Sequence, residues 1–159
     1  MPYKSLSAVL LFLSVFAFLS CQFDSVYNNV VFIEDQGWEK DEATHFEVNI
    51  SDTISLYDFS IIVHNTADYR YSNLYIFLTS KFPNGNLTRD TIECVLADAS
   101  GKWFGKGWGN VKETDILLKP NLRFPLSGQY NFYVQQAMRK DTLMGIQSIG
   151  LRLDKTEKN

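Results

Sequence analysis

The stretch Leu74-Tyr75-Ile76-Phe77-Leu78, followed by the turn Pro83-Asn84-Gly85-Asn86, is the clearest structural signal in the chain. Apolar side chains that alternate with a period of two are typical of a β-strand with one buried face. A second alternating run follows the turn, with Ile92, Cys94 and Leu96 on one face. Because Asn-Gly accepts the positive φ angles of a tight turn, the stretch predicts an antiparallel hairpin.

The same alternation continues on both sides of this hairpin. Its apolar members are Val30 and Phe32; Phe46, Val48 and Ile50; Tyr57, Phe59, Ile61 and Val63; Tyr130, Phe132 and Val134; and Ile149, Leu151 and Leu153. Turn signals at 51–52, 65–68 and 125–128 separate the runs. Residues 135–140 predict at most one short helical turn. Seven or eight short strands predict an all-β fold, a single antiparallel β-sandwich of jelly-roll or immunoglobulin-like type.

Length and composition agree with one domain and exclude several functions. The chain has 159 residues, 45% of them hydrophobic, and a formal net charge of −3. A pI near 5.3 argues against a nucleic-acid partner, because phosphate binding needs a basic surface. Two Cys and two His are too few for a disulfide framework or a four-ligand zinc site. We therefore expect neither a metal nor a cofactor.

The first twenty residues predict a signal peptide. Lys4 supplies the positive charge, and the apolar run from Leu6 to Phe18 is too short to span a bilayer as a helix. The run ends in Phe18-Leu19-Ser20-Cys21, which resembles a bacterial lipobox with Phe18 in place of the usual Leu. The alternative is a plain secretory signal with a cysteine near its cleavage site.

In the lipoprotein interpretation, Cys21 is the lipidated N-terminus of the mature chain. Several fatty-acyl chains such as palmitate would hold the protein in a membrane. Gln22, where Asp would indicate retention in the inner membrane, resembles an outer-membrane address. Cys94 is then a lone thiol that we expect in the core. The domains that follow are a lipoprotein signal peptide at 1–20, the lipidated cysteine and tether at 21–28, and the β-sandwich at 29–159.

An unusual stretch reads Asp98-Ala99-Ser100-Gly101-Lys102-Trp103-Phe104-Gly105-Lys106-Gly107-Trp108-Gly109-Asn110. Its glycine spacing does not match a dinucleotide fingerprint, and Trp103 stands where a phosphate-binding loop needs Ser or Thr. One interpretation is a structural loop with positive-φ glycines, fixed by a tryptophan that packs on the sandwich. The other is an aromatic recognition loop, because tryptophan is enriched at interface hot spots. The sequence leaves both open.

No catalytic pattern is present. The chain lacks a Gly-x-Ser-x-Gly elbow, and neither His45 nor His64 has a second His or a Cys at ligand spacing. We interpret both histidines as surface or hydrogen-bonded structural residues, and the chain as a non-enzyme.

Seven ordered segments carry a resemblance to a known family. They are Trp38-Glu39-Lys40-Asp41, Asp68-Tyr69-Arg70-Tyr71-Ser72-Asn73-Leu74-Tyr75, Phe82-Pro83-Asn84-Gly85, Asp90-Thr91-Ile92-Glu93, Ala97-Asp98-Ala99-Ser100-Gly101-Lys102-Trp103-Phe104-Gly105-Lys106-Gly107, Gln136-Ala137-Met138-Arg139 and Gly150-Leu151-Arg152. With this pattern the mature chain resembles the gliding-motility lipoprotein GldH family of Bacteroidetes. Ala99 stands where the family has Pro, and Trp108 where a smaller residue is common.

The resemblance implies a non-enzymatic lipoprotein of the cell envelope, at the outer membrane, that supports gliding and the type IX secretion machinery. Its expected partners are other gliding-motility or type IX secretion lipoproteins and membrane proteins, and the membrane itself through the lipid anchor. The resemblance brings no catalytic residues. Candidate partner contacts, chosen for an exposed aromatic patch, are Lys102, Trp103, Phe104, Trp108, Tyr69 and Tyr71.

A carbohydrate-binding surface module is the alternative function. β-Sandwiches with exposed tryptophans often bind sugars, and Asp98, Lys102 and Asn110 could flank the two tryptophans of the loop. Fold alone does not distinguish the two, because sandwiches host many functions.

Overall fold

The structure is a computed structural model that describes residues 25–34, 37–107 and 109–156. Within these ranges the chain forms ten β-strands and no helix, and therefore no helix that could cross a membrane. The strands are β1 (Ser25–Phe32), β2 (Trp38–Glu39), β3 (Ala43–Ile50), β4 (Tyr57–Thr66), β5 (Asn73–Lys81), β6 (Leu87–Val95), β7 (Val111–Leu122), β8 (Gly128–Gln136), β9 (Thr142–Leu143) and β10 (Ile146–Lys155).

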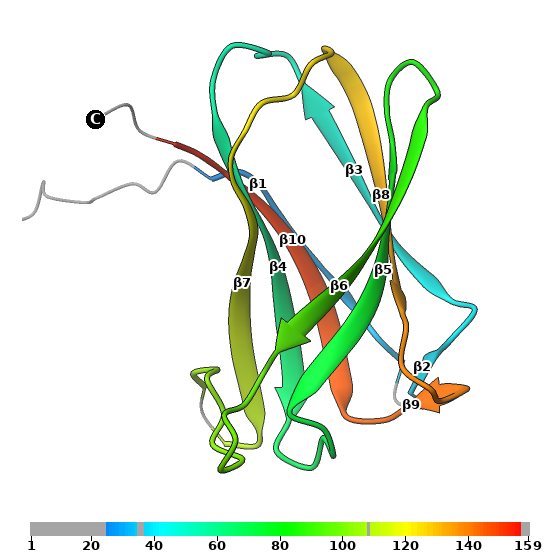
Figure 1. The fold of residues 1–159 in the computed structure, drawn as a ribbon, viewed down its shortest axis with the longest axis vertical. Helices are drawn as coiled ribbons and strands as arrows, with labels where there is room; N and C mark the ends of the chain where they lie inside the picture. The colour runs from blue at the N-terminus through cyan, green and yellow to red at the C-terminus, as the bar shows by residue number, and fades with distance from the viewer. Residues whose placement is uncertain (1–24, 35–36, 108, 157–159) are drawn as a thin grey trace, which may run out of the picture.

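The eight long strands form two four-stranded antiparallel sheets that face each other (Figure 1). One sheet has the order β1-β10-β4-β7 and the other β3-β8-β5-β6, while the two-residue strands β2 and β9 form a separate small pair. The predicted single antiparallel β-sandwich is thus confirmed. The small pair brings the number of strands above the seven or eight that the sequence indicated.

Strand pairing is nested around the Asn84-Gly85 turn. β5 pairs with β6, β4 with β7, β3 with β8, β2 with β9 and β1 with β10, so strands equally far from the turn are neighbours. Gly85 has φ +86°, and the Phe82 N–H donates to the Asn86 carbonyl over 2.8 Å. A ribbon folded at one turn and wound into two sheets is a jelly roll, which decides between the two predicted topologies.

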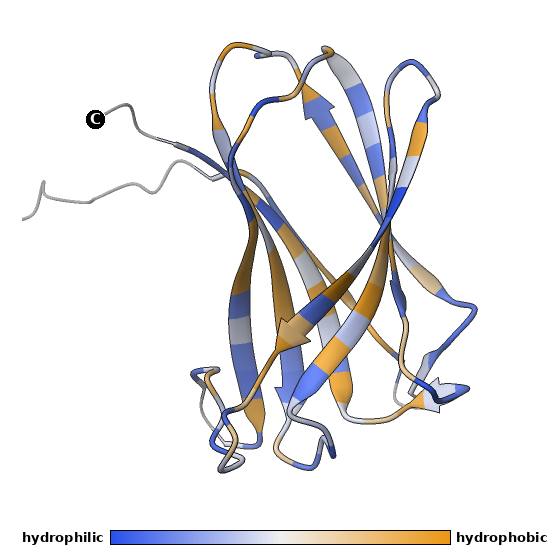
Figure 2. Cartoon of the chain, in the orientation of Figure 1, coloured by the Kyte–Doolittle hydropathy of each residue, from blue (hydrophilic) through white to orange (hydrophobic). Residues whose placement is uncertain are grey.

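The core lies between the sheets, as the alternation predicted. Figure 2 shows apolar and polar residues alternating along several strands. The buried apolar residues of both sheets form one core cluster. Aromatic side chains fill one part of the core, where Tyr130 lies 4.9 Å from Phe124 and Phe59 lies 5.2 Å from Phe132, measured between ring centroids. Cys94 is fully buried, as expected, and burial raises the pKa of its thiol to about 12.

Three local expectations differ from the structure. β1 begins at Ser25, so residues 25–28 of the predicted tether pair with the end of β10, where Tyr27 lies opposite Leu153. The helical turn predicted at 135–140 is wrong, because β8 continues through Gln136 and bends follow it. β7 was not predicted, because Pro120 and its many charged residues hide an edge strand.

Antiparallel strands divide the connections between two ends of the sandwich (Figure 1). We call one the turn end, where Ser25 and Lys155 lie and where short turns join β3 to β4, β5 to β6 and β7 to β8. We call the other the loop end, where β1 is joined to β3, β4 to β5, β6 to β7 and β8 to β10.

Candidate functional site

The loop end brings together four of the segments on which the sequence resemblance rests. These segments are 38–41, 68–75, 97–107 and 136–139, which are far apart in the chain. Backbone hydrogen bonds join two of them, because the N–H groups of Leu96 and Ala97 both donate to the Ser72 carbonyl, over 2.8 and 2.9 Å. The loop end is therefore the candidate functional site.

Asp98 organises the first half of the segment between β6 and β7. Its Oδ1 accepts hydrogen bonds from the Ser100 N–H at 2.8 Å, the Ser100 hydroxyl at 2.7 Å and the Lys102 N–H at 3.0 Å. These bonds, the Ser100 hydroxyl first, hold the pKa of the Asp98 carboxyl below its usual value. Gly101 completes the turn with φ +84°. The turn sends the chain back toward the sandwich.

Trp103 is half-buried and packs against the core. It forms a β-bridge with Ala97, and its ring lies 6.5 Å from that of Tyr69, which in turn contacts Tyr71 edge-on at 5.5 Å. Tyr69 is only 4% exposed, and its hydroxyl donates to the Asn73 carbonyl over 3.0 Å. The exposed aromatic patch expected at this turn is therefore wrong for Tyr69, which belongs to the core.

Two glycines let the loop lie directly against β7. A Cβ on Gly105 would stand 2.8 Å from the Glu113 carbonyl oxygen, and one on Gly107 would stand 2.2 Å from that of Val111. Between them, Lys106 exchanges two backbone hydrogen bonds with Glu113, of 3.0 and 2.8 Å. These glycines serve close packing of two backbones. Positive φ, which the structural interpretation expected, is found at Gly101 and Gly109 but not at Gly105 or Gly107.

Among the described residues of this loop, Phe104 is an exposed apolar side chain. It is 58% exposed, between Lys102 and Lys106, which are also exposed, whereas its neighbour Trp103 points inward. The Phe104 N–H donates to the Leu96 carbonyl over 2.9 Å, so the backbone beneath the ring is fixed. Two of the residues predicted to act, Trp108 and the lipidated Cys21, lie outside the described residues.

Two of the polar side chains expected to flank a bound sugar, Asp98 and Asn110, form hydrogen bonds within the protein. Asp98 is bound within its turn, as described above. The Asn110 amide lies 3.5 Å from the Asp68 carboxylate through Nδ2 and 3.3 Å from the Ala67 N–H through Oδ1. Both side chains therefore have hydrogen-bond partners within the protein.

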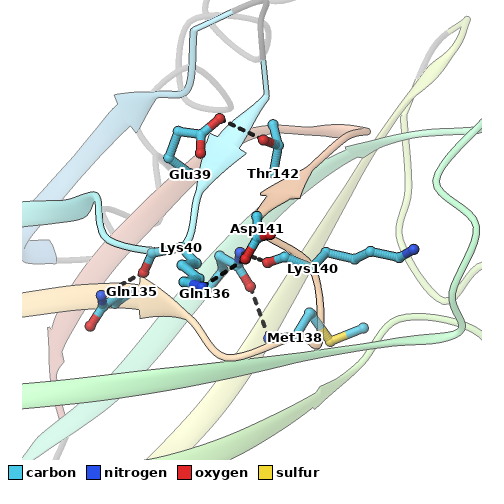
Figure 3. Close-up of polar contacts among 8 residues, drawn as sticks. All are labelled: Glu39, Lys40, Gln135, Gln136, Met138, Lys140, Asp141 and Thr142. Atoms are coloured by element: carbon cyan, nitrogen blue, oxygen red, sulfur yellow. Dashed lines mark hydrogen bonds and ion pairs between the residues drawn. The ribbon is translucent and has the colours of Figure 1, made fainter.

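The other half of the loop end is a polar network that links the β2–β9 pair to β8 (Figure 3). The Lys40 ammonium lies 2.6 Å from the Asp141 carboxylate, and the Thr142 hydroxyl donates to the Glu39 carboxylate over 2.6 Å. The hydrogen bond from Lys40 lowers the pKa of Asp141, and the same contact raises the pKa of Lys40. The charge cluster at 39–42 thus has partners on a distant segment.

Two glutamines fix the segment that follows β8. The Gln136 side chain donates to the Lys140 carbonyl over 2.8 Å and accepts from the Met138 N–H over 2.9 Å, while the Gln135 amide donates to the Lys40 carbonyl over 2.5 Å (Figure 3). This network was not predicted from the sequence, because the bonds of Lys40, Glu39 and Gln135 join residues about a hundred positions apart in the chain. The signal that could have found it is the nested pairing around the Asn84-Gly85 turn.

Trp38 anchors the β2–β9 pair to the core. It is fully buried, and its indole N–H donates to the Glu42 carbonyl over 3.0 Å. Leu143, its partner in the small pair, is buried as well. A fully buried tryptophan with a satisfied N–H gives this exposed network a rigid base.

His64 lies between a serine and a glutamate, as the histidine of a hydrolytic triad does. Its two ring nitrogens, however, have the opposite partners from those in a triad. Its Nδ1 lies 2.9 Å from the Ser148 hydroxyl and its Nε2 lies 2.8 Å from the Glu113 carboxylate. Ser148 is buried and Glu113 exposed, so the hydroxyl that would attack a substrate is the inaccessible member. Over the described ranges, no cluster of His, Cys, Asp or Glu side chains is placed to hold a metal.

Comparisons with known proteins agree on one family. The model of the GldH lipoprotein family matches residues 25–153. The chain is 36% identical to a gliding motility lipoprotein GldH homolog of Christiangramia forsetii, over 97% of this chain and 99% of the relative. It is 25% identical to the gliding motility lipoprotein GldH of Flavobacterium johnsoniae, over 95% of this chain and 97% of the relative.

Proposed function

The chain belongs to the GldH lipoprotein family of gliding motility, and from this premise we propose that it is a non-enzymatic accessory component of the gliding and type IX secretion machinery. In this proposal Cys21 carries the lipid anchor in the outer membrane. The partners are other lipoproteins or membrane proteins of the same machinery. The names of both relatives, which call them lipoproteins, support the anchor.

One observation carries the site of contact: Phe104 stands exposed on a loop whose backbone is hydrogen-bonded on both sides. An aromatic side chain on a rigid backbone loses little conformational entropy when it enters a pocket. The flanking Lys102 and Lys106 favour a partner pocket with carboxylates at its rim. We propose that Phe104 and the two lysines form the centre of the contact. Tyr71 and Trp103, which are partly buried and packed against the core, support this part of the loop end.

The position of the loop end fits an anchored protein. Ser25, the first described residue, lies at the turn end, at the opposite end of the strands from Phe104. A lipid on Cys21 therefore leaves the loop end free for a partner. The same anchor brings the protein to the membrane where its proposed partners reside.

The test is affinity capture of the tagged, lipidated protein from its native membranes, with Cys21→Ala to remove the anchor. We expect specific recovery of gliding or type IX secretion components, and a loss of about tenfold or more when Phe104→Ser removes the central contact. Ile54→Ser is the matched control, because Ile54 is 77% exposed at the turn end.

Two results would count against the proposal. Equal capture by Phe104→Ser and Ile54→Ser would remove the loop end as the contact. Recovery of glycan or lipid alone by the unmodified protein, together with binding on a glycan array, would favour the carbohydrate-binding alternative instead.

A further inference from the structure

β6 is an edge strand whose outer side is open. It lies at the end of the β3-β8-β5-β6 sheet, and among the described residues its strand partner is β5. The pairing with β5 runs through nine residues without a register shift. The neighbouring edge β7, by contrast, has register shifts and contains Lys119 and Pro120, which protect an edge.

The hydrogen bonds at both ends of the β5–β6 ladder show which groups of β6 face outward. Phe82 bonds to Asn86 at one end, and Leu96 bonds to Ser72 at the other, in the same register as the strands. Even-numbered residues of β6 therefore face β5. Because bonded and free positions alternate along an antiparallel strand, the free N–H and C=O groups belong to the odd-numbered residues. These are Leu87, Arg89, Thr91, Glu93 and Val95.

The odd-numbered residues are complementary to themselves. We propose that β6 pairs in antiparallel orientation with β6 of a second copy of this chain, about a two-fold axis at Thr91. In this register Arg89 of each copy lies opposite Glu93 of the other, and Leu87 lies opposite Val95. Opposite charges and apolar residues on directly facing positions are the pairs that stabilise a sheet. An interface that repeats the same contacts in both copies is typical of protein dimers.

The exposure of the two apolar residues supports this register. Leu87 is 65% exposed and Val95 is 50% exposed, although both lie in a regular strand. A shift of one residue would set the free backbone groups of one copy against bonded groups of the other. A shift of two residues would set Arg89 opposite Thr91, and the charge pair would be lost.

The present contacts of the charged pair are compatible with the dimer. The Arg89 guanidinium lies 4.3 Å from the centroid of the Phe77 ring, and the Glu93 carboxylate accepts a bond of 2.6 Å from Asn73. These contacts hold both side chains on the outer face of their own sheet. The partner side chains of the second copy lie on that same face, because facing residues of an antiparallel pair point the same way.

The symmetry also suits a protein with one anchor per copy. A two-fold axis perpendicular to the sheet keeps the β1-β10-β4-β7 sheets of both copies on one side of the dimer. β1 with its first residue Ser25 belongs to this sheet. Both anchors can therefore reach a membrane on that side. Each loop end lies beside the hairpin tip of the other copy, because this register sets Asn84 of one copy level with Asp98 of the other.

The first test is a disulfide at the two-fold axis, in the full-length chain in its native membranes. Opposed residues in a hydrogen-bonded antiparallel pair have Cα atoms about 5.5 Å apart, which a disulfide spans. With a mild oxidant, Thr91→Cys is expected to give most of the protein as a dimer on a non-reducing gel. Asn84→Cys, exposed at the tip of the hairpin, and the unchanged chain are the controls. A Thr91→Cys dimer at or below the Asn84→Cys level would overturn the proposal.

The second test addresses the register. Arg89→Glu in the Thr91→Cys background places like charges opposite each other twice and should lower the dimer yield about fivefold. Exchange of both charges, Arg89→Glu with Glu93→Arg, should restore the yield. Circular dichroism should show the same fold for all variants, because both residues are exposed. A yield that is indifferent to Arg89→Glu, or that the double exchange does not restore, contradicts the pairing about Thr91.

Discussion

The two ends of the sandwich are built in different ways. At the turn end, each connection closes through bonds between close neighbours: Asp52 binds Ile54 and Ser55, and Phe82 bonds with Asn86 across the Asn84-Gly85 turn. At the loop end, the connections are held by bonds between distant segments, as between Lys40 and Asp141 or between Ser72 and Leu96. Bonds between close neighbours dominate at the turn end, although Asp52 also binds the distant Lys155, whereas the loop end combines local turns such as that of Asp98 with bonds between distant segments.

This difference separates scaffold from candidate contact surface. A turn held by bonds between close neighbours has the same shape whatever segments surround it. It therefore contributes little specificity for a partner. A surface assembled from several segments has a fixed shape that depends on the whole domain, which suits recognition. Three comparisons, two of substitutions and one of titrations, test this contrast between the two ends.

The largest effect is expected from Trp38→Ala, which removes the base of the loop end. Loss of a fully buried tryptophan should lower the free energy of unfolding by about 3–5 kcal/mol. Ile54→Ala at the turn end should change it by less than about 0.5 kcal/mol, because Ile54 is exposed. Chemical denaturation measures both values. Similar losses of unfolding free energy in the two variants would mean that Trp38 stabilises the domain no more than an exposed turn residue does.

Glycine substitutions should give a smaller contrast of a different kind. Gly107→Ala forces a methyl group onto the Val111 carbonyl and should cost about 2–3 kcal/mol. Gly85→Ala meets open space and suffers only from its positive φ, at a cost of about 1 kcal/mol. Thermal unfolding ranks the two. If Gly85→Ala were the more damaging, the loop would not depend on close contact with β7.

The smallest effect compares two aspartates, one at each end. Asp52 accepts bonds from the Ser55 hydroxyl, two backbone N–H groups and Lys155, whereas Asp98 has the Ser100 hydroxyl and two backbone N–H groups. Both carboxyls have a pKa below the usual 3.8, Asp52 because of the Ser55 hydroxyl first. Their contribution to stability is therefore complete above that value and is lost as the pH falls through the lowered pKa.

We expect the Asp98 turn to lose its bonds at a higher pH than the Asp52 turn, since Asp52 also has the Lys155 ammonium. Carbon-detected NMR titration of the two carboxyl groups gives both midpoints directly. Equal midpoints would show that Lys155 adds nothing in solution.

The sequence predicted the parts of the fold that local pattern encodes. Alternation at Phe46–Ile50 and at Tyr130–Val134 marked strands with one buried face, and Asn84-Gly85 marked the central turn. β7 was not predicted, because an edge strand with Pro120 and charged residues shows no clear alternation of apolar and polar side chains. The nested pairing selects the jelly roll, and no local signal contains it.

The candidate site was predicted in composition but not in arrangement. The sequence left two roles open for the loop. In the structure Trp103 packs against the core and Phe104 is exposed, which is why we propose Phe104 as the contact. Burial of Tyr69 had no sequence signal, because a tyrosine in a polar turn reads as exposed. Its environment depends on Trp103 and Gly145, which come from other segments.

The nested pairing around Asn84-Gly85 also predicts an order for folding. The β5–β6 hairpin closes a short loop, and each later pair closes around the pair before it, so the entropy cost of each closure stays small. The last pair, β1 with β10, joins the two ends of the domain. A chain that crosses a membrane N-terminus first therefore keeps β1 without its partner until β10 has emerged, and the sandwich cannot be completed before that moment.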